Sequence, residues 1–194
     1  YRVGCDWGPA GADAVGPGAA IVAVVDVLSF TTALTVAADR GIEVFPYRWR
    51  DERAASFADQ HDAMLAVGRS EVSQDQPVSL SPATIRASSG VRRLVLPSPN
   101  GSAIARRLAA LGATVIGVSL RNARAAAAWT ALQLEADAAV AVIPAGERWK
   151  RQSSGTRWNA RCTQYCVRSA TSRIAANWTR NGSPATNACT AGCE

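Results

Sequence analysis

Four short polar segments each follow an apolar run of the chain, and they hold the residues best suited to acid, base or anion chemistry. The segments are residues 26–32 (DVLSFTT), 97–102 (PSPNGS), 119–122 (SLRN) and 144–148 (PAGER). Asp26 stands within an otherwise apolar stretch, where a carboxylate is costly to bury unless it meets a cation or a hydrogen-bond donor. The alternative is that Asp26 only caps the following turn or pairs with an arginine. We favour a functional carboxylate, because perturbed carboxylates at strand ends are enriched in sites.

Donors for an anion accompany this carboxylate. The hydroxyls of Ser29, Thr31 and Thr32 lie where a predicted helix begins, and the first turn of that helix also offers free N–H groups. The second and third segments add further candidates for anion binding, which are Asn100, Gly101, Ser102, Arg121 and Asn122. Each of these residues could instead be an ordinary cap or turn residue. Glu147 in the fourth segment offers a second carboxylate.

Several familiar chemistries are excluded by the sequence. The chain has no G-x-x-x-x-G-K-[ST] loop, no G-x-G-x-x-G fingerprint and no G-x-S-x-G elbow. His61 is the single histidine, so any histidine-based triad would have to use it. Its helical spacing with Phe57 and Leu65 favours a packing role over a catalytic one.

The elements that must position these segments alternate along the chain. Apolar runs rich in β-branched residues predict strands at residues 20–28, 42–47, 93–96, 114–118 and 138–143. Helical spacing of Ala and Leu predicts helices at residues 30–40, 51–66, 102–111 and 123–134. Strands that alternate with helices of this length predict a mostly parallel sheet with helices on both faces. The carboxyl ends of the strands then meet at one edge, where ligands bind in such folds. Residues 70–90, rich in Ser, Gln and Pro, predict a long connection.

The C-terminal stretch differs in composition from the rest of the chain. Residues 1–149 hold 14 basic and 14 acidic residues, whereas residues 150–194 hold seven basic residues against Glu194 alone. The net charge of +6 therefore lies entirely in this stretch, which also lacks Leu and carries four of the five cysteines. We expect an α/β domain over residues 1–149, followed by a basic, cysteine-containing tail that is disordered or read in a shifted frame.

The composition also bears on location and partners. Hydrophobic residues make up 48% of the 194 residues, enough for a packed core, yet no apolar run reaches the length of a membrane span. The body has a single cysteine, Cys5, so a disulfide framework is not expected there and a reducing, cytoplasmic setting is the default. No nucleic-acid motif accompanies the basic tail. We expect no membrane or nucleic-acid partner, and a homo-oligomer is left open.

The four segments, in this order, resemble the signature segments of the 2-phosphosulfolactate phosphatase family. Residues 5–8 (CDWG) and 47–53 (YRWRDER) look like further segments of its actinobacterial-type members. The likeness runs through about residues 1–149. It implies a three-layer α/β/α fold and a Mg²⁺-dependent phosphomonoesterase that converts 2-phosphosulfolactate and water into 3-sulfolactate and phosphate, a step in coenzyme M synthesis.

A phosphomonoester needs donors around its oxygens and a cation that bridges it to a carboxylate. Asp26 is the expected ligand of Mg²⁺, and whether it also attacks phosphorus is left open. Glu147 is a further metal ligand or general base, and the eight donor residues named above would bind the substrate. The alternatives are a phosphatase of another small phosphorylated metabolite and a non-catalytic anion-binding protein with a basic tail.

Overall fold

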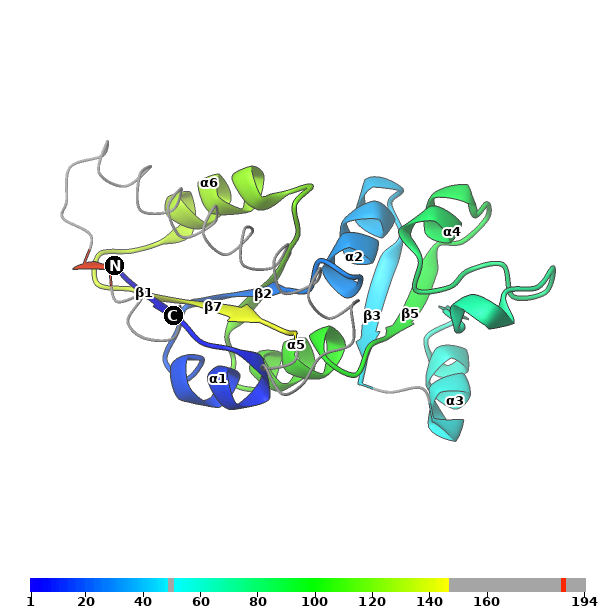
Figure 1. Cartoon of the computed structure of the whole chain (residues 1–194), viewed down its shortest axis with the longest axis horizontal. Helices are drawn as coiled ribbons and strands as arrows, with labels where there is room; N and C mark the ends of the chain where they lie inside the picture. The colour runs from blue at the N-terminus through cyan, green and yellow to red at the C-terminus, as the bar shows by residue number, and fades with distance from the viewer. Residues whose placement is uncertain (49–50, 147–185, 188–194) are drawn as a thin grey trace, which may run out of the picture.

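The computed structural model describes residues 1–48, 51–146 and 186–187, whose arrangement Figure 1 shows. The strands are β1 (Arg2–Cys5), β2 (Ile21–Val25), β3 (Glu43–Tyr47), β4 (Met64–Leu65), β5 (Arg93–Pro97), β6 (Thr114–Val118), β7 (Ala139–Pro144) and β8 (Thr186–Asn187). The helices are α1 (Gly8–Val15), α2 (Phe30–Asp39), α3 (Glu52–Gln60), the 3-10 turn η1 (Arg69–Glu71), α4 (Pro82–Ala87), α5 (Gly101–Ala109) and α6 (Ala123–Gln133).

The strands form two sheets rather than one. The first has the order β6-β2-β7-β1-β8 and the second the order β3-β5-β4. Every pair of neighbouring strands in these sheets is parallel. The predicted class, a three-layer α/β/α fold with parallel strands, is confirmed, and the division into two sheets is an addition to it.

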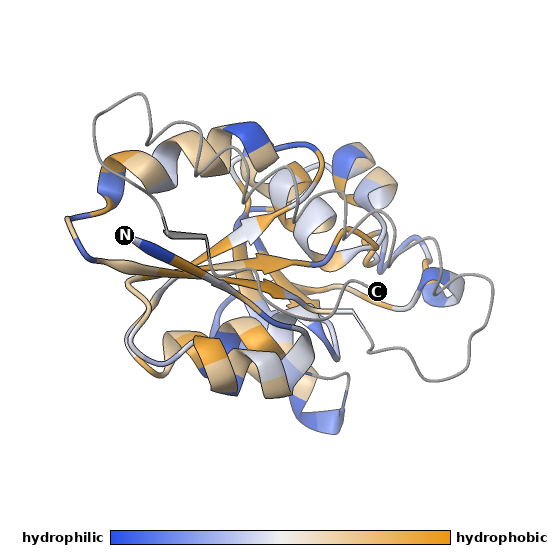
Figure 2. Cartoon of the chain, turned by 60° about the vertical axis from the view of Figure 1, so that its left-hand side comes forward, coloured by the Kyte–Doolittle hydropathy of each residue, from blue (hydrophilic) through white to orange (hydrophobic). Residues whose placement is uncertain are grey.

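The larger sheet is buried on both faces. Along β2, Val22 and Val24 belong to the core formed with α1 and α5, while Ala23 and Val25 belong to the core formed with α6. This alternation is the two-residue period of a strand, and both sets are apolar because helices cover both faces. Figure 2 shows the apolar residues running along the central strands between the helices. A run of five buried residues in β2 is the result.

Helices α2 and α5 connect the two sheets. Each of them contacts β6 of the first sheet and β3 of the second. In Figure 1 they lie above and below the space between the sheets, with α4 near α2 and α3 near β5. Phe30 and Ala33 of α2 pack with Leu94 and Leu96 of β5 in the core of the second sheet. The chain therefore crosses from the first sheet to the second through α2 and returns through α5.

Two predicted elements differ from the structure. The helix expected over residues 51–66 ends at Gln60, because Asp62 takes a positive φ of 48° that no helix continues through, and β4 follows. The connection expected over residues 70–90 contains part of η1 and all of α4. In it Val78 and Ile85 are buried in the second core, whereas residues 71–77 are exposed, so only the later part of the segment packs against the core.

The tail predicted from residue 150 onward lies outside the described residues apart from β8. Thr186 and Asn187 pair in parallel with Arg2 and Val3 of β1. Within the described ranges, every helix falls short of the length and apolar character that a membrane crossing requires.

Candidate active site

Asp26 lies at the carboxyl end of β2, in the middle of the larger sheet. Its neighbour Val25 pairs with Val118 of β6 on one side and with Pro144 of β7 on the other. The backbone N–H of Ala145 donates to the carbonyl oxygen of Val25 at 2.9 Å. Three of the four polar segments therefore meet at one edge of this sheet, as the sequence predicts.

The remaining polar segment, residues 97–102, reaches the same place from the other sheet. It follows β5 and opens α5, whose first residue is Gly101. A Cβ built on Gly101 would lie 2.7 Å from Oδ2 of Asp26 and would also collide with the ring of Phe30. Real Cβ atoms do not approach other atoms so closely, so this position requires glycine.

The Asp26 carboxylate sits between the starts of two helices. It accepts hydrogen bonds from the backbone N–H of Gly101, at the start of α5, and from that of Phe30, at the start of α2. The residue is only 6% exposed. Burial raises the pKa of Asp26 from 3.8 to about 6, and the two N–H groups oppose that rise without cancelling it. The helix N-termini predicted to cradle an anion thus hold the protein's own carboxylate.

All four of the predicted hydroxyls are bonded to the backbone, that of Ser29 to the segment before α4. The Thr31 hydroxyl donates 2.7 Å bonds to the carbonyl oxygens of Asp26 and Val118, which ties the turn after β2 to β6. Thr32 donates to Val27 at 2.7 Å and Ser102 to Leu96 at 2.8 Å. Thr31 and Ser102 are fully buried. Their side chains fix the two loops on which the site is built.

Ser29 connects the site with the segment before α4. Its hydroxyl donates to the carbonyl oxygen of Leu80 at 3.1 Å. Leu80 also lines a cavity of about 740 Å³, together with Pro97 and Pro99 of the loop that leads into α5. This cavity adjoins the loop before α5, and three carboxylates, Asp51, Glu52 and Glu71, also line it. No pattern in residues 70–90 indicated that the segment would reach the site.

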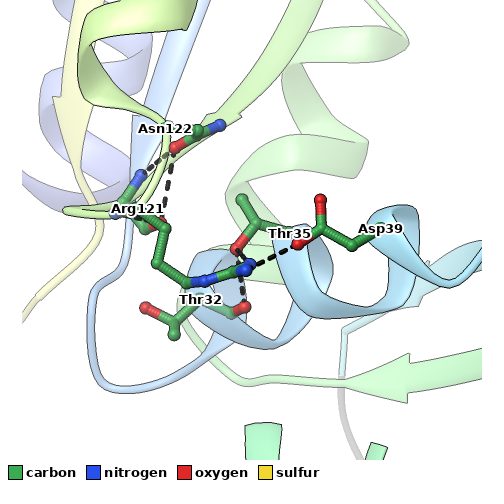
Figure 3. A network of polar contacts seen from close by, with 6 residues as sticks. Thr32, Thr35, Asp39, Arg121 and Asn122 are labelled. Carbon is green, nitrogen blue, oxygen red and sulfur yellow. Dashed lines mark hydrogen bonds and ion pairs between the residues drawn. The ribbon is translucent and has the colours of Figure 1, made fainter. Parts of the chain in front are cut away.

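Arg121 and Asn122 come from the loop between β6 and α6, as Figure 3 shows. Arg121 donates to Oγ1 of Thr35 at 3.0 Å and pairs with the Asp39 carboxylate at 2.5 Å, so its guanidinium lies along α2. The Asn122 amide accepts from Ser119 N–H at 2.8 Å and donates to the carbonyl of Gly117 at 2.9 Å. Asn122 therefore shapes its own loop, whereas Arg121 is partly exposed.

Asn100 differs from the other candidates. It occupies the N-cap position of α5, yet its side chain makes no capping hydrogen bond. Its amide does not hold the start of α5, and it directly precedes Gly101, whose N–H binds the Asp26 carboxylate.

Two predictions concern metal ligands. Glu147 lies outside the described residues. Within residues 1–48 and 51–146, no three His, Cys, Asp or Glu side chains come together as a ready-made metal site. Of the two predicted carboxylates, the structure places Asp26 at the predicted edge, where Asp6 also follows β1 of the same sheet.

His61 packs among aromatic side chains, but not in the helical arrangement with Leu65 that its spacing predicts, because α3 ends at Gln60 and Leu65 lies in β4. Its ring lies 4.2 Å from that of Phe57 and 4.6 Å from that of Phe45, measured between centroids. Its Nδ1 stands 2.8 Å from the carbonyl oxygen of Phe57. The imidazole is thus held in an aromatic cluster between α3 and β3.

Sequence reasoning missed one participant in the site, Phe30. Its backbone N–H binds the Asp26 carboxylate and its ring lies against Gly101. The position of Phe30 at the start of a predicted helix already indicates a free N–H group. Its apolar side chain, however, is typical of a core residue, so sequence reasoning overlooked its backbone.

The fold and the edge around Asp26 define an α/β protein with a buried carboxylate at the strand ends, in the position where this class binds anionic ligands. The chain belongs to the 2-phosphosulpholactate phosphatase family, whose model matches residues 13–155. The match begins later than the expected resemblance over residues 1–149 and extends six residues beyond it. No curated protein matches the chain.

Proposed function

We propose that this chain hydrolyses a phosphomonoester at the edge around Asp26, and that the substrate is 2-phosphosulfolactate. Water would cleave the ester to 3-sulfolactate and phosphate, as part of a coenzyme M-type pathway in the cytoplasm. The observation that carries the proposal is the buried Asp26 carboxylate, bound by the first N–H groups of α2 and α5, in a chain of this phosphatase family.

The proposed roles follow from what each side chain already binds. Asn100 and Arg121 would donate to the substrate, the first because it makes no capping bond and the second because it is partly exposed. Ser29 would bind the substrate beside Leu80, the cavity-lining residue to whose carbonyl oxygen its hydroxyl donates. Glu147 would act as a second carboxylate.

The remaining candidates would position the loops. The hydroxyls of Thr31 and Ser102 are buried and satisfied by carbonyl oxygens, and Thr32 also donates to the backbone. The Asn122 amide bonds within its own loop. Their contribution to binding would be indirect, through the geometry of the Gly101 and Phe30 N–H groups.

One observation supports the proposal of Mg²⁺ at this site. Burial leaves the Asp26 charge poorly solvated, and within the described residues no arginine or lysine pairs with it. Mg²⁺ is commonly bound by one or two carboxylates together with substrate phosphate and water. Asp26 would hold the ion, with Glu147 as the second carboxylate. When bound, Mg²⁺ would neutralise negative charge on the phosphoryl oxygens.

The test is phosphate release by the full chain with 2-phosphosulfolactate, in Mg²⁺ and in EDTA. We expect Mg²⁺-dependent release, lost in Asp26→Asn, since this change removes a charge and little volume. Asp13→Asn is the matched control, because Asp13 is an exposed carboxylate paired with Arg107. Faster phosphate release from another phosphomonoester than from 2-phosphosulfolactate would identify that ester as the better substrate. An Asp26→Asn protein with normal turnover would refute the role of Asp26, and a folded chain inactive on every ester would indicate an anion-binding protein.

A further inference from the structure

A second cavity, of about 280 Å³, lies between the two sheets. Its walls come from both sheets and from the two helices that connect them. They include Phe30 and Leu34 of α2, Pro46 of β3, Ala105 and Ala109 of α5, and Val115 of β6. These side chains are apolar, so the cavity favours an apolar group over water.

The sequence accounts for this open space. β6 and β3 are edge strands of their sheets, and side chains of α2 and α5 lie between them. On the side of α5 the cavity is bordered by Ala105 and Ala109, whose methyl groups leave it unfilled. At Gly117 of β6 a Cβ would collide with Leu34, so Leu34 already occupies the space above this glycine.

One charged side chain, Arg106 of α5, lines the cavity. Its guanidinium carbon lies 5.6 Å from the ring centroid of Tyr47 and 5.5 Å from that of Phe57, and Nη1 donates to the carbonyl oxygen of Pro46 at 3.4 Å. These contacts hold the guanidinium but leave most of its donors without an acceptor.

Like several other arginines of the described ranges, Arg106 has no carboxylate partner there, whereas three arginines do. Its neighbour Arg107 pairs with Asp13 at 2.6 Å, and Arg121 and Arg93 pair with Asp39 and Glu43. A planar guanidinium binds a carboxylate best, through two parallel N–H bonds. The ligand that best matches this cavity therefore has an apolar body and a single carboxylate.

We propose that this cavity binds a small amphipathic carboxylate, with its apolar body between Phe30, Leu34 and Val115 and its carboxylate on Arg106. An apolar cavity of about 150 Å³ holds a benzene molecule in a well-studied protein. The larger volume here accommodates a benzene-sized group with a short acidic arm. The proposal uses no side chain assigned to the phosphatase reaction, and the Phe30 ring, which lines the cavity and also lies against Gly101, connects the two places.

The probe is phenylacetate, and its neutral counterpart phenylacetamide tests the need for charge. A ligand of about ten non-hydrogen atoms is expected to bind in the millimolar range. Binding to the full chain is measured by ligand-detected NMR titration, which needs no enzyme activity. We expect phenylacetate to bind, and both phenylacetamide and acetate to bind at least about tenfold more weakly, since each lacks one of the two interactions.

Two variants locate the site. Ala109→Leu fills the cavity from an exposed helix position that tolerates leucine, and we expect it to abolish binding. Arg106→Gln should weaken phenylacetate at least about tenfold while leaving phenylacetamide unchanged. Arg107→Gln is the matched control, since it removes the adjacent arginine, which does not line the cavity. The proposal is overturned if wild type binds neither probe, if phenylacetamide binds as well as phenylacetate, or if Ala109→Leu leaves the phenylacetate affinity unchanged.

Discussion

Gly101 and Asp26 are 75 positions apart in the chain, yet the backbone of Gly101 lies directly against the Asp26 carboxylate. The Gly101 N–H donates to that carboxylate, and any Cβ on Gly101 would stand 2.7 Å from Oδ2. One residue follows a strand of the larger sheet and the other follows a strand of the smaller sheet. Through this contact, residues from two sheets form one polar edge. The site requires glycine at position 101, because any side chain there would collide with the carboxylate.

Gly101→Ala is expected to damage the site more than the fold. The new methyl group must displace the Asp26 carboxylate or the Phe30 ring, at a cost in unfolding free energy of about 1–3 kcal/mol. Phosphate release should fall by at least about 100-fold, because a displacement of about 1 Å in a reacting group costs that much. Activity is measured well below the melting temperature, and far-UV circular dichroism checks the fold. Normal turnover in a folded Gly101→Ala protein would contradict the close approach.

The raised pKa of Asp26 predicts how stability changes with pH in the metal-free protein. The folded pKa of about 6 exceeds the ordinary 3.8, so the folded state holds its proton more tightly than the unfolded state. Asp26 therefore favours folding most below pH 4, and this contribution is lost as pH rises from about 4 to about 6. The shift corresponds to roughly 3 kcal/mol of unfolding free energy.

Asp26→Asn removes this penalty, so in EDTA the variant should be more stable than wild type at pH 7.5, with the difference shrinking toward pH 4. Urea denaturation of both proteins at several pH values measures it, and Asp13→Asn controls for general effects of losing a carboxylate. Equal stabilities at pH 7.5 and pH 4 would show that Asp26 is not destabilised by burial. A stabilised but inactive variant would identify Asp26 as a residue kept for function at the expense of stability.

The sequence predicts the alternation of strands and helices well, because each central strand is buried on both faces and is therefore apolar throughout. β2, with five buried residues, is the clearest case. The same signal fails for α1, which is built from Gly, Ala and Pro and has little helical pattern to detect. It also fails for α4, whose six residues are too few to show a period.

The site is predicted in its location but not in its bonding. Strand ends and helix starts indicate where Asp26 and Gly101 must be, since both follow apolar runs. What their partners are depends on tertiary contacts. Thr31 and Ser102 look like ligand-binding hydroxyls in the sequence and bond to backbone carbonyls in the structure. The division into two sheets is equally hidden, because strand spacing along the chain does not say which strands pair.

The ion pair between Arg121 and Asp39 predicts an effect on substrate affinity. Both side chains are largely exposed, at 38% and 64%, so the pair is worth about 0.2–1 kcal/mol. Asp39→Asn should therefore leave the stability almost unchanged. If Arg121 binds the substrate, as proposed, removing its competitor should lower KM by up to about fivefold with kcat unchanged. Asp13→Asn, which breaks the similarly exposed pair with Arg107, should leave KM unaltered. A raised KM in Asp39→Asn would mean that Asp39 holds Arg121 in its working position.

His61→Gln tests the packing role of the imidazole. The ring contacts with Phe57 and Phe45 should be lost at a cost of about 1 kcal/mol in unfolding free energy. Phosphate release should stay within a few-fold of wild type, because the cluster lies between α3 and β3 rather than at the strand ends. A loss of about 1000-fold in kcat would instead make His61 a general acid or base.

Thr130 of α6 offers a test that concerns stability alone. Its hydroxyl is buried, with the residue 1% exposed, and has no hydrogen-bond partner in the described part of the chain. An unpaired buried hydroxyl costs about 1–3 kcal/mol, and valine has nearly the same shape without it. Thr130→Val should therefore raise the unfolding free energy by about 1 kcal/mol, after a small loss in helix propensity.

Thr130→Ser is the matched control: it keeps the hydroxyl and removes the methyl group, so it should destabilise. Urea denaturation with an unchanged slope measures both changes. If Thr130→Val destabilises as much as Thr130→Ser does, the hydroxyl has a partner beyond the described residues, and α6 is held by a polar contact as well as by its apolar face.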